Sequence, residues 1–173
     1  MNIPLIHLFA EQILESETHI DVLINNAGLG VGQLVEDCPE EDWDLVMDTN
    51  AKGTFLMSKA VLPTMQKSGG YIINIASQAA KRGYPMVASY CASKFGILGF
   101  SDALQHEVKD EGIRVHCLNP GLIQTPEPSS PTEINAEILS VTDVVESAMF
   151  VLTRPAHVKI EDLGMYNLFD TQL

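Results

Sequence analysis

The sequence predicts an α/β fold in which helices cover both faces of a parallel sheet. Short apolar runs bounded by turn residues alternate along the chain with longer stretches of helical periodicity, and this alternation is typical of repeated β-α units. The runs are apolar at successive positions, as expected of parallel strands buried on both faces. With 173 residues and 46% hydrophobic content, the chain is expected to form a single domain, 1–173.

Turn residues and helix-start signals place the elements in order. Pro39 is expected to open a helical stretch, because proline is favoured at the first helical position. The other predicted helices span 3–16, 51–66, 87–109 and 142–152. The predicted strands span 20–25, 71–76, 112–119 and 160–167. The proline- and serine-rich segment 125–140 has the composition of a mobile flap over a site.

The stretch DVLINNAGLGVG, at positions 21–32, raises the question of a phosphate-binding loop. A strand that runs into a glycine-rich turn and a helix can seat a pyrophosphate, because backbone N–H groups and the helix N-terminus attract anions. A G-x-G-x-x-G pattern starting at Gly28 needs glycine at position 33, where Gln33 stands. The next helix is expected only at Pro39. The pattern therefore favours a strand-end loop whose glycines allow close packing.

Composition and charge argue against several classes of function. The formal net charge is −13, the isoelectric point is about 4.6, and the ten lysines and arginines form no basic stripe, so no nucleic-acid partner is expected. No apolar run has the roughly 18 residues of a membrane helix, and the N-terminus lacks a basic signal-peptide region. We therefore expect a cytoplasmic protein without a membrane partner. The three cysteines and five histidines lack metal-ligand spacing, so no metal site is predicted.

The stretch SYCASKFG carries the sharpest chemical signal. Tyr90 and Lys94 stand four residues apart on a predicted helix, so their side chains share one face. A nearby ammonium favours the phenolate and lowers the pKa of a tyrosine from about 10 towards the range of a general acid or base. Such a tyrosine can protonate a carbonyl oxygen while a hydride arrives at the carbon. Taken alone, the pair also fits an ordinary exposed helix face.

Further motifs surround this pair at a characteristic spacing. Ser77 ends the strand YIINIAS, thirteen residues before Tyr90, and Asn50 ends DTN before a long helix. NNAG occupies 25–28 and PGLIQT occupies 120–125. Taken singly, these elements fit a helix cap, a strand-end hydroxyl or a plain turn. In this order, the whole set resembles the short-chain dehydrogenase/reductase family over nearly the entire chain.

The resemblance implies a catalytic set and a cofactor site. Tyr90 would be the general acid or base, and Lys94 would lower its pKa and bind the nicotinamide ribose. Ser77 would orient and polarise the substrate carbonyl, and Asn50 would help hold a water on a proton-relay path. The cofactor, NAD or NADP, would contact Asn26, Ala27, Gly28, Tyr90, Lys94, Pro120, Gly121, Ile123 and Thr125. Thr125 would contact the nicotinamide carboxamide, and the substrate would be a small alcohol or carbonyl compound.

The resemblance also implies a partial Rossmann-like, doubly wound parallel sheet made of family strands 4 to 7. In the family, the glycine-rich phosphate turn TGxxxGxG lies on the first strand, and this chain contains no such turn. We therefore expect a shortened member that lacks two β-α units, a third strand and the residue that selects NAD or NADP. The complete strand order, 3-2-1-4-5-6-7, would leave the run IDVLIN as an open apolar edge.

Three functions stay open at this point. The favoured one is an NAD(P)-dependent oxidoreductase, and whether this chain is active alone is left open. The second is a non-catalytic relative that serves as a dimerisation or partner-binding module. Family members commonly form dimers or tetramers through the helices equivalent to 51–66 and 87–109. The third is a sugar-nucleotide epimerase or dehydratase, disfavoured because only about fifty residues follow Gly121.

Overall fold

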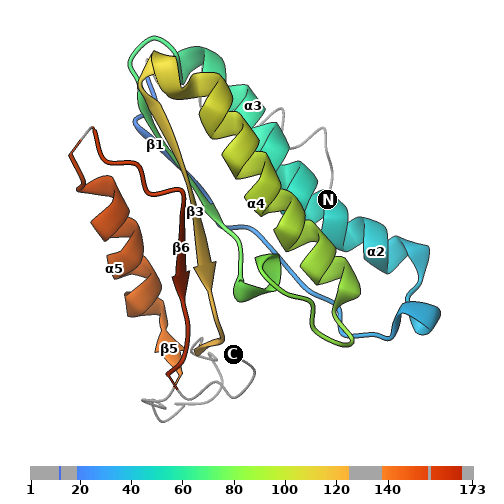
Figure 1. The fold of residues 1–173 in the computed structure, drawn as a ribbon. Coiled ribbons are helices and arrows are strands. Elements are labelled where there is room, and N and C mark those ends of the chain that lie inside the picture. Colours follow the sequence, from blue (N-terminus) through green and yellow to red (C-terminus); the bar gives the residue numbers. More distant parts are fainter. Residues whose placement is uncertain (1–11, 13–18, 125–137, 156, 169–173) are drawn as a thin grey trace.

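Four parallel strands form the central sheet of the computed structural model (Figure 1). The structure describes residues 12, 19–124, 138–155 and 157–168. The strands lie in the order β1 (Val22–Asn25), β2 (Gly70–Ile75), β3 (Ile113–Pro120) and β6 (Asp162–Met165). This arrangement confirms the predicted α/β fold and places all four strands within two residues of their predicted bounds. The predicted strand over 160–167 is shorter in the structure.

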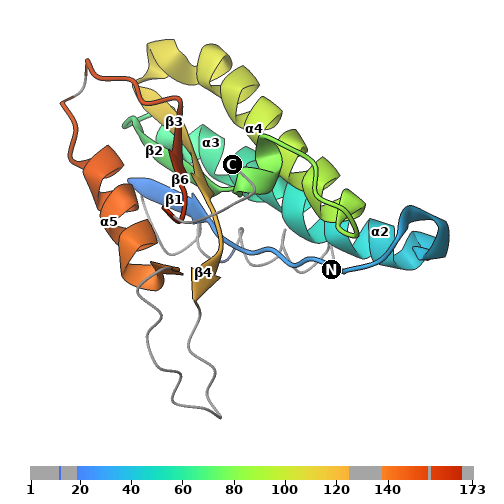
Figure 2. The same cartoon turned by 60° about the horizontal axis from the view of Figure 1, so that its bottom comes forward.

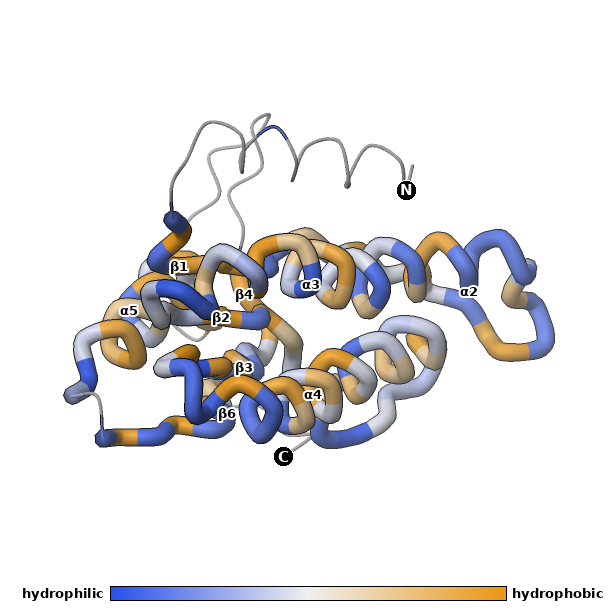
Figure 3. Tube along the Cα trace, turned by 90° about the horizontal axis from the view of Figure 1, so that it is seen from above, coloured by the Kyte–Doolittle hydropathy of each residue, from blue (hydrophilic) through white to orange (hydrophobic). Residues whose placement is uncertain are grey.

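Helices cover both faces of this sheet, as predicted. They are α2 (Glu40–Met47), α3 (Gly53–Met65), α4 (Ala88–Val108) and α5 (Val141–Leu152). Helices α3 and α4 lie side by side on one face, and α5 lies on the other (Figure 1). Seen from above, hydrophobic residues mark the strands and alternate with polar residues along the helices (Figure 3). Among the described residues, no helix combines the length and apolar character that a membrane crossing requires.

Neighbouring residues of β2 face different cores. Ile72 packs in a cluster with Val61 of α3 and Leu104 of α4, whereas Ile73 packs with Val151 of α5. The strand order β1-β2-β3-β6 means that all three crossovers step in the same direction across the sheet. When successive crossovers step in the same direction, their hand depends only on the sheet face that the connecting helix covers. Helices α3 and α4 cover one face and α5 covers the other. The connection that carries α5 therefore differs in hand from the other two, although nearly all such crossovers are right-handed.

A row of polar side chains crosses the sheet face beneath α3 and α4. Asn25 Nδ2 donates to Asn74 Oδ1 at 2.8 Å and to Ser58 Oγ at 3.2 Å. Asn74 Nδ2 donates to Ser101 Oγ at 2.8 Å, and Ser101 Oγ donates to Ile97 O at 2.7 Å. These polar groups are buried, and each is matched by a partner of opposite role, which avoids the cost of an unpaired buried group.

A π-helical turn, Asp48–Lys52, joins α2 to α3 without a break. The predicted helix over 51–66 is thus confirmed, and its α-helical part begins at Gly53. Such single turns occur mostly inside α-helices and often at functional sites. The turn contains Asn50, one of the predicted catalytic residues, and its side chain is fully buried.

Several predictions fall outside the described residues or differ from the structure. Apart from residue 12, the predicted helix over 3–16 lies outside the described residues, as does most of the flap over 125–140, including Thr125. A second, two-stranded parallel sheet pairs β4 (Ile123–Gln124) with β5 (Leu139–Ser140) and was not predicted from the sequence. Figure 2 shows β4 beyond the carboxyl end of β3. Strands of two residues are too short to leave a periodic signal in the sequence.

The turn between α3 and β2 requires glycine at two positions. Gly69 has a φ of +74° and Gly70 a φ of +150°. A Cβ atom at Gly70 would lie 2.7 Å from both Asp21 O and Met65 Cε, far inside normal contact distance. Neither the backbone conformation nor the packing therefore accepts a side chain here.

We predict that Gly70→Ala destabilises the fold by about 2 kcal/mol or more, because backbone strain alone costs on the order of 1–3 kcal/mol. Urea unfolding followed by circular dichroism measures the effect. Gly83→Ala is the matched control, since a Cβ there would have no neighbour within 4 Å and should change stability by less than about 0.5 kcal/mol. Equal stability of the two variants would contradict the packing described.

Candidate active site

A groove lies at the carboxyl ends of β1, β2 and β3. Parallel strands bring their carboxyl ends to one edge of a sheet, where ligands of open α/β folds bind. The groove has a volume of about 490 Å³. Its lining includes eight residues predicted from the sequence: Asn26, Gly28, Ser77, Tyr90, Lys94, Pro120, Gly121 and Ile123. Ala27 belongs to the same loop but is not part of the lining.

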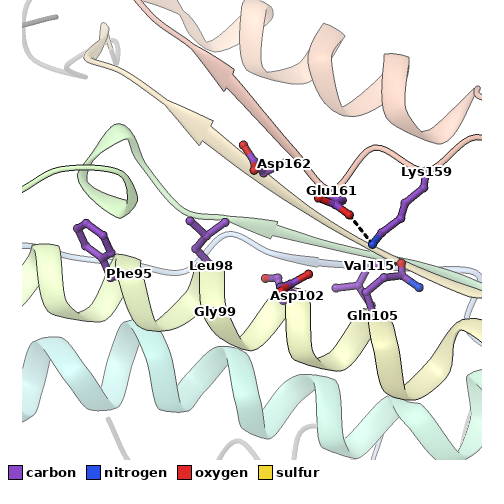
Figure 4. A pocket seen from close by; sticks show the side chains of 10 residues that line it. Phe95, Leu98, Gly99, Asp102, Gln105, Val115, Lys159, Glu161 and Asp162 are labelled. Carbon is purple, nitrogen blue, oxygen red and sulfur yellow. Dashed lines mark hydrogen bonds and ion pairs between the residues drawn. The ribbon is translucent and has the colours of Figure 1, made fainter.

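A second cavity, of about 380 Å³, lies between α4 and the chain leading into β6 (Figure 4). Phe95 and Asp102 line it from α4, and Lys159 and Glu161 line it from the other side. Lys159 Nζ forms an ion pair with Glu161 Oε1 at 2.7 Å. None of the residues predicted from the sequence lines this cavity, so the groove at the strand ends is the candidate active site.

Tyr90 and Lys94 share one face of α4, as the spacing predicts. Lys94 Nζ lies 5.5 Å from the centroid of the Tyr90 ring. The lysine side chain is 4% exposed, and its Nζ donates a hydrogen bond to Ile75 O at 2.9 Å. Burial lowers the pKa of Lys94 from 10.5 to about 8, because removal from water disfavours the charged form. The lysine is therefore a partly desolvated cation directly behind the tyrosine.

Ser77 lies where the chain leaves β2. Its extended backbone caps a short 3-10 helix, Gln78–Ala80, and its Oγ accepts a hydrogen bond from Ala79 N at 3.1 Å. The hydroxyl oxygen is thereby held in place by the backbone. Because this bond uses the oxygen only as an acceptor, the Ser77 proton can be donated to a carbonyl oxygen in the groove.

The Asn50 side chain does not line the groove but lies behind it. Its Oδ1 accepts from Leu29 N at 2.9 Å, and its Nδ2 donates to Leu29 O at 2.8 Å and to Ser93 Oγ at 2.9 Å. Both amide protons are therefore used within the protein. The Asn50 backbone carbonyl accepts from Thr54 Oγ1 at 2.8 Å. The side chain thus holds the loop after β1 in a fixed position.

Two glycines of that loop, Gly28 and Gly30, lie directly against side chains of the candidate active site. A Cβ atom at Gly28 would lie 3.3 Å from both Asn50 Oδ1 and Lys94 Nζ, and one at Gly30 would lie 3.2 Å from Tyr90 Cδ2. Close packing at these glycines was predicted from the sequence, but Gly30 was not predicted as part of the site. The available signal was the second glycine of GLG, whose missing side chain leaves room for the Tyr90 ring and is not required by a positive φ.

Comparison with known proteins identifies the family of this chain. A sequence model described as short chain dehydrogenase matches residues 6–133. The chain belongs to the short chain dehydrogenase family. One relative, from Streptomyces virginiae, carries the name of a ketoacyl reductase of monensin polyketide synthase and is 42% identical over 121 residues, 68% of this chain and 46% of its own length. An uncharacterised oxidoreductase of Staphylococcus saprophyticus is 34% identical, with 88% of this chain and 66% of that relative covered.

A solved structure shares the fold of nearly the whole of this member of the short chain dehydrogenase family. It is an alcohol dehydrogenase of the archaeon Thermococcus sibiricus complexed with 5-hydroxy-NADP, with a TM-score of 0.87 and 25% identity. The match covers 97% of this chain and 72% of that one. The chain thus spans about half to two thirds of the length of the two relatives named above.

We predict a pH-dependent stability difference between the parent protein and Lys94→Met. The unfolded chain binds the Lys94 proton up to about pH 10.5, whereas the folded chain releases it near pH 8. The cost of burying the ammonium is therefore present below pH 8 and disappears as the pH rises to 10.5. The free energy of unfolding of the parent should gain about 3 kcal/mol relative to Lys94→Met across this range. Urea titrations of both proteins at several pH values measure the difference, and a constant difference would contradict the burial of this charge.

Proposed function

We propose that this protein is an NAD(P)-dependent oxidoreductase that transfers a hydride between a nicotinamide cofactor and a small carbonyl or alcohol substrate. One observation carries the proposal: Tyr90, Lys94 and Ser77 converge on one groove from separate elements of the fold. The groove falls within the range of about 300–1,000 Å³ typical of small-molecule sites. A non-catalytic binding module gives no reason for this convergence.

The groove is suited to the nicotinamide half of a dinucleotide. Gly28 and Gly30 are exposed, and their missing side chains leave a bare backbone wall beside Lys94 and Tyr90. The residues that would hold the cofactor are Asn26, Ala27, Gly28, Tyr90, Lys94, Pro120, Gly121 and Ile123, together with Thr125, which is outside the described residues. When bound, NAD or NADP supplies or accepts the hydride.

The side chains of this chain would manage the proton and the developing charge. Tyr90 would donate its phenolic proton to the carbonyl oxygen during reduction and take it back during oxidation. The Lys94 ammonium, held by Ile75 O, would stabilise the resulting phenolate and hold the nicotinamide ribose. Ser77 would donate its hydroxyl proton to the oxygen on which negative charge develops. Through the second lone pair of its Oδ1, Asn50 would help hold a water on the path by which the proton returns to Tyr90, since both of its amide protons are used within the protein.

We also propose that the protein forms a homodimer or homotetramer through α3 and α4. Phe55 of α3 is 44% exposed and Phe95 of α4 is 46% exposed. Phe55 packs edge-on against Phe100 of α4 with ring centroids 6.2 Å apart, so the two helices are joined by an aromatic contact next to the exposed face of Phe55. Exposed aromatic side chains on adjacent helices are typical of protein interfaces. We further propose that the protein acts in the cytoplasm.

We predict that Tyr90→Phe lowers the turnover of small ketones by about 100- to 10,000-fold, the usual contribution of general acid catalysis. The fold should be retained, because the aromatic ring that packs against Gly30 remains. The measurement is the loss of reduced nicotinamide absorbance with NADH and with NADPH over a panel of small ketones.

Tyr71→Phe is the matched control for this experiment. Tyr71 lies on β2 and stacks with His116, and it does not line the groove. Its turnover should equal that of the parent protein. Equal turnover of Tyr90→Phe and the parent would refute the role assigned to Tyr90.

A further inference from the structure

Ser93 lies between Tyr90 and Lys94 on α4 and is fully buried. Its Oγ lies 2.8 Å from Tyr90 O and 2.9 Å from Asn50 Nδ2. The direction of both hydrogen bonds is fixed by chemistry, because an amide nitrogen only donates and a carbonyl oxygen only accepts. Ser93 therefore donates its proton to Tyr90 O and accepts one from Asn50.

This bond fixes the orientation of the Asn50 amide. With one Nδ2 proton directed at Ser93, the other is donated to Leu29 O, and Oδ1 accepts from Leu29 N. The amide thus binds the backbone of Leu29 on both sides, as a neighbouring strand would. Without Ser93, the buried second proton of Nδ2 would have no partner in this arrangement, and an unpaired buried donor destabilises the arrangement that leaves it unpaired.

Leu29 is flanked by the two glycines that lie against the Lys94 and Tyr90 side chains. Gly28 lies against Lys94 Nζ, and Gly30 lies against the Tyr90 ring. The contacts form a closed circuit from the Tyr90 carbonyl through Ser93, Asn50 and Leu29 back to the Tyr90 ring. A shift of the loop at Leu29 would therefore change the wall on which the Tyr90 ring and the Lys94 ammonium rest.

We propose that Ser93 is a positioning residue for the reaction. It acts through Asn50 and Leu29 to hold the loop 28–30 against Tyr90 and Lys94, so that the phenolic oxygen is presented to the substrate at a fixed place. The catalytic part of this inference rests on the function proposed above. Misplacement of a reacting group by about 1 Å can lower a rate 100-fold, so the expected effect falls on turnover.

The chain offers a matched control in Ser101. This serine is also buried on α4, its Oγ donates to a backbone carbonyl, that of Ile97, at 2.7 Å, and it accepts from an asparagine amide, that of Asn74, at 2.8 Å. These hydrogen bonds of Ser101 join it to Ile97 and Asn74, which are not part of the circuit. A comparison of Ser93→Ala with Ser101→Ala therefore distinguishes the effect of losing the hydrogen bond to Asn50 from the effect of losing any buried serine hydroxyl group on α4.

The first measurement is steady-state kinetics of both variants with a ketone that the parent protein reduces. Ser93→Ala should lower kcat by about 10- to 100-fold while KM for the ketone and Kd for the cofactor stay within about threefold, since positioning acts on the transition state. Ser101→Ala should keep kcat within about twofold of the parent. Equal losses of kcat in the two variants would overturn the proposal.

The second measurement is hydrogen exchange of the Leu29 amide by NMR, which needs no activity. In Ser93→Ala, loss of the anchor on Asn50 should speed this exchange about tenfold or more, whereas Ser101→Ala should leave it unchanged. If the parent reduces no ketone, the proposed function fails while the exchange rates still decide whether Ser93 holds the loop. Unchanged exchange at Leu29 would overturn that link. Should Ser93→Ala not fold, Ser93→Cys, with its weaker hydrogen bonds, replaces it and should show smaller shifts in the same direction.

Discussion

The hydrogen bond from Lys94 Nζ to Ile75 O connects the helix that carries Tyr90 to the end of a central strand. It is made by a cation that is almost completely buried, so its position is set by the few polar atoms around it. Because Ile75 ends β2 and Ser77 follows two residues later, this one bond sets where the lysine, the tyrosine and the serine lie relative to one another. The remaining parts of the site, including the loop after β1, are built around that arrangement.

Much of the fold was predictable from local pattern, because four short apolar runs and the helices between them have clear periods. The opposite hand of the crossover that carries α5 was not predictable, since the sequence of α5 gives its apolar side but not the sheet face that it covers. The predicted site residues came from motif spacing, which finds side chains that touch a substrate. It did not find Ser93 or Gly30, because their contacts join positions 43 and 60 residues apart, Asn50 with Ser93 and Gly30 with Tyr90.

The buried Lys94 lowers the stability of the fold while it supplies a charge to the candidate active site. An ammonium that is 4% exposed is costly to bury, and an apolar side chain of similar length would fill the same space without that cost. The free-energy cost of burying this ammonium has an explanation if the charge takes part in the reaction. Buried groups with shifted pKa values are in general associated with functional sites. The polar contacts of Ser77 and Asn50 follow the same logic, since each fixes a side chain near the groove.

The row of amides and hydroxyls beneath α3 and α4 has a further consequence for how the strands align. Asn25 and Asn74 are direct partners in the pairing of β1 with β2, and their side chains bond to each other and to serines of α3 and α4. If β1 slid by one residue, Asn25 would turn to the other face of the sheet, and Asn74 would lose its partner. Apart from Asn25, the short edge strand β1 carries only apolar side chains, Val22, Leu23 and Ile24, and has little else to set its alignment. This polar row therefore fixes the register of the sheet.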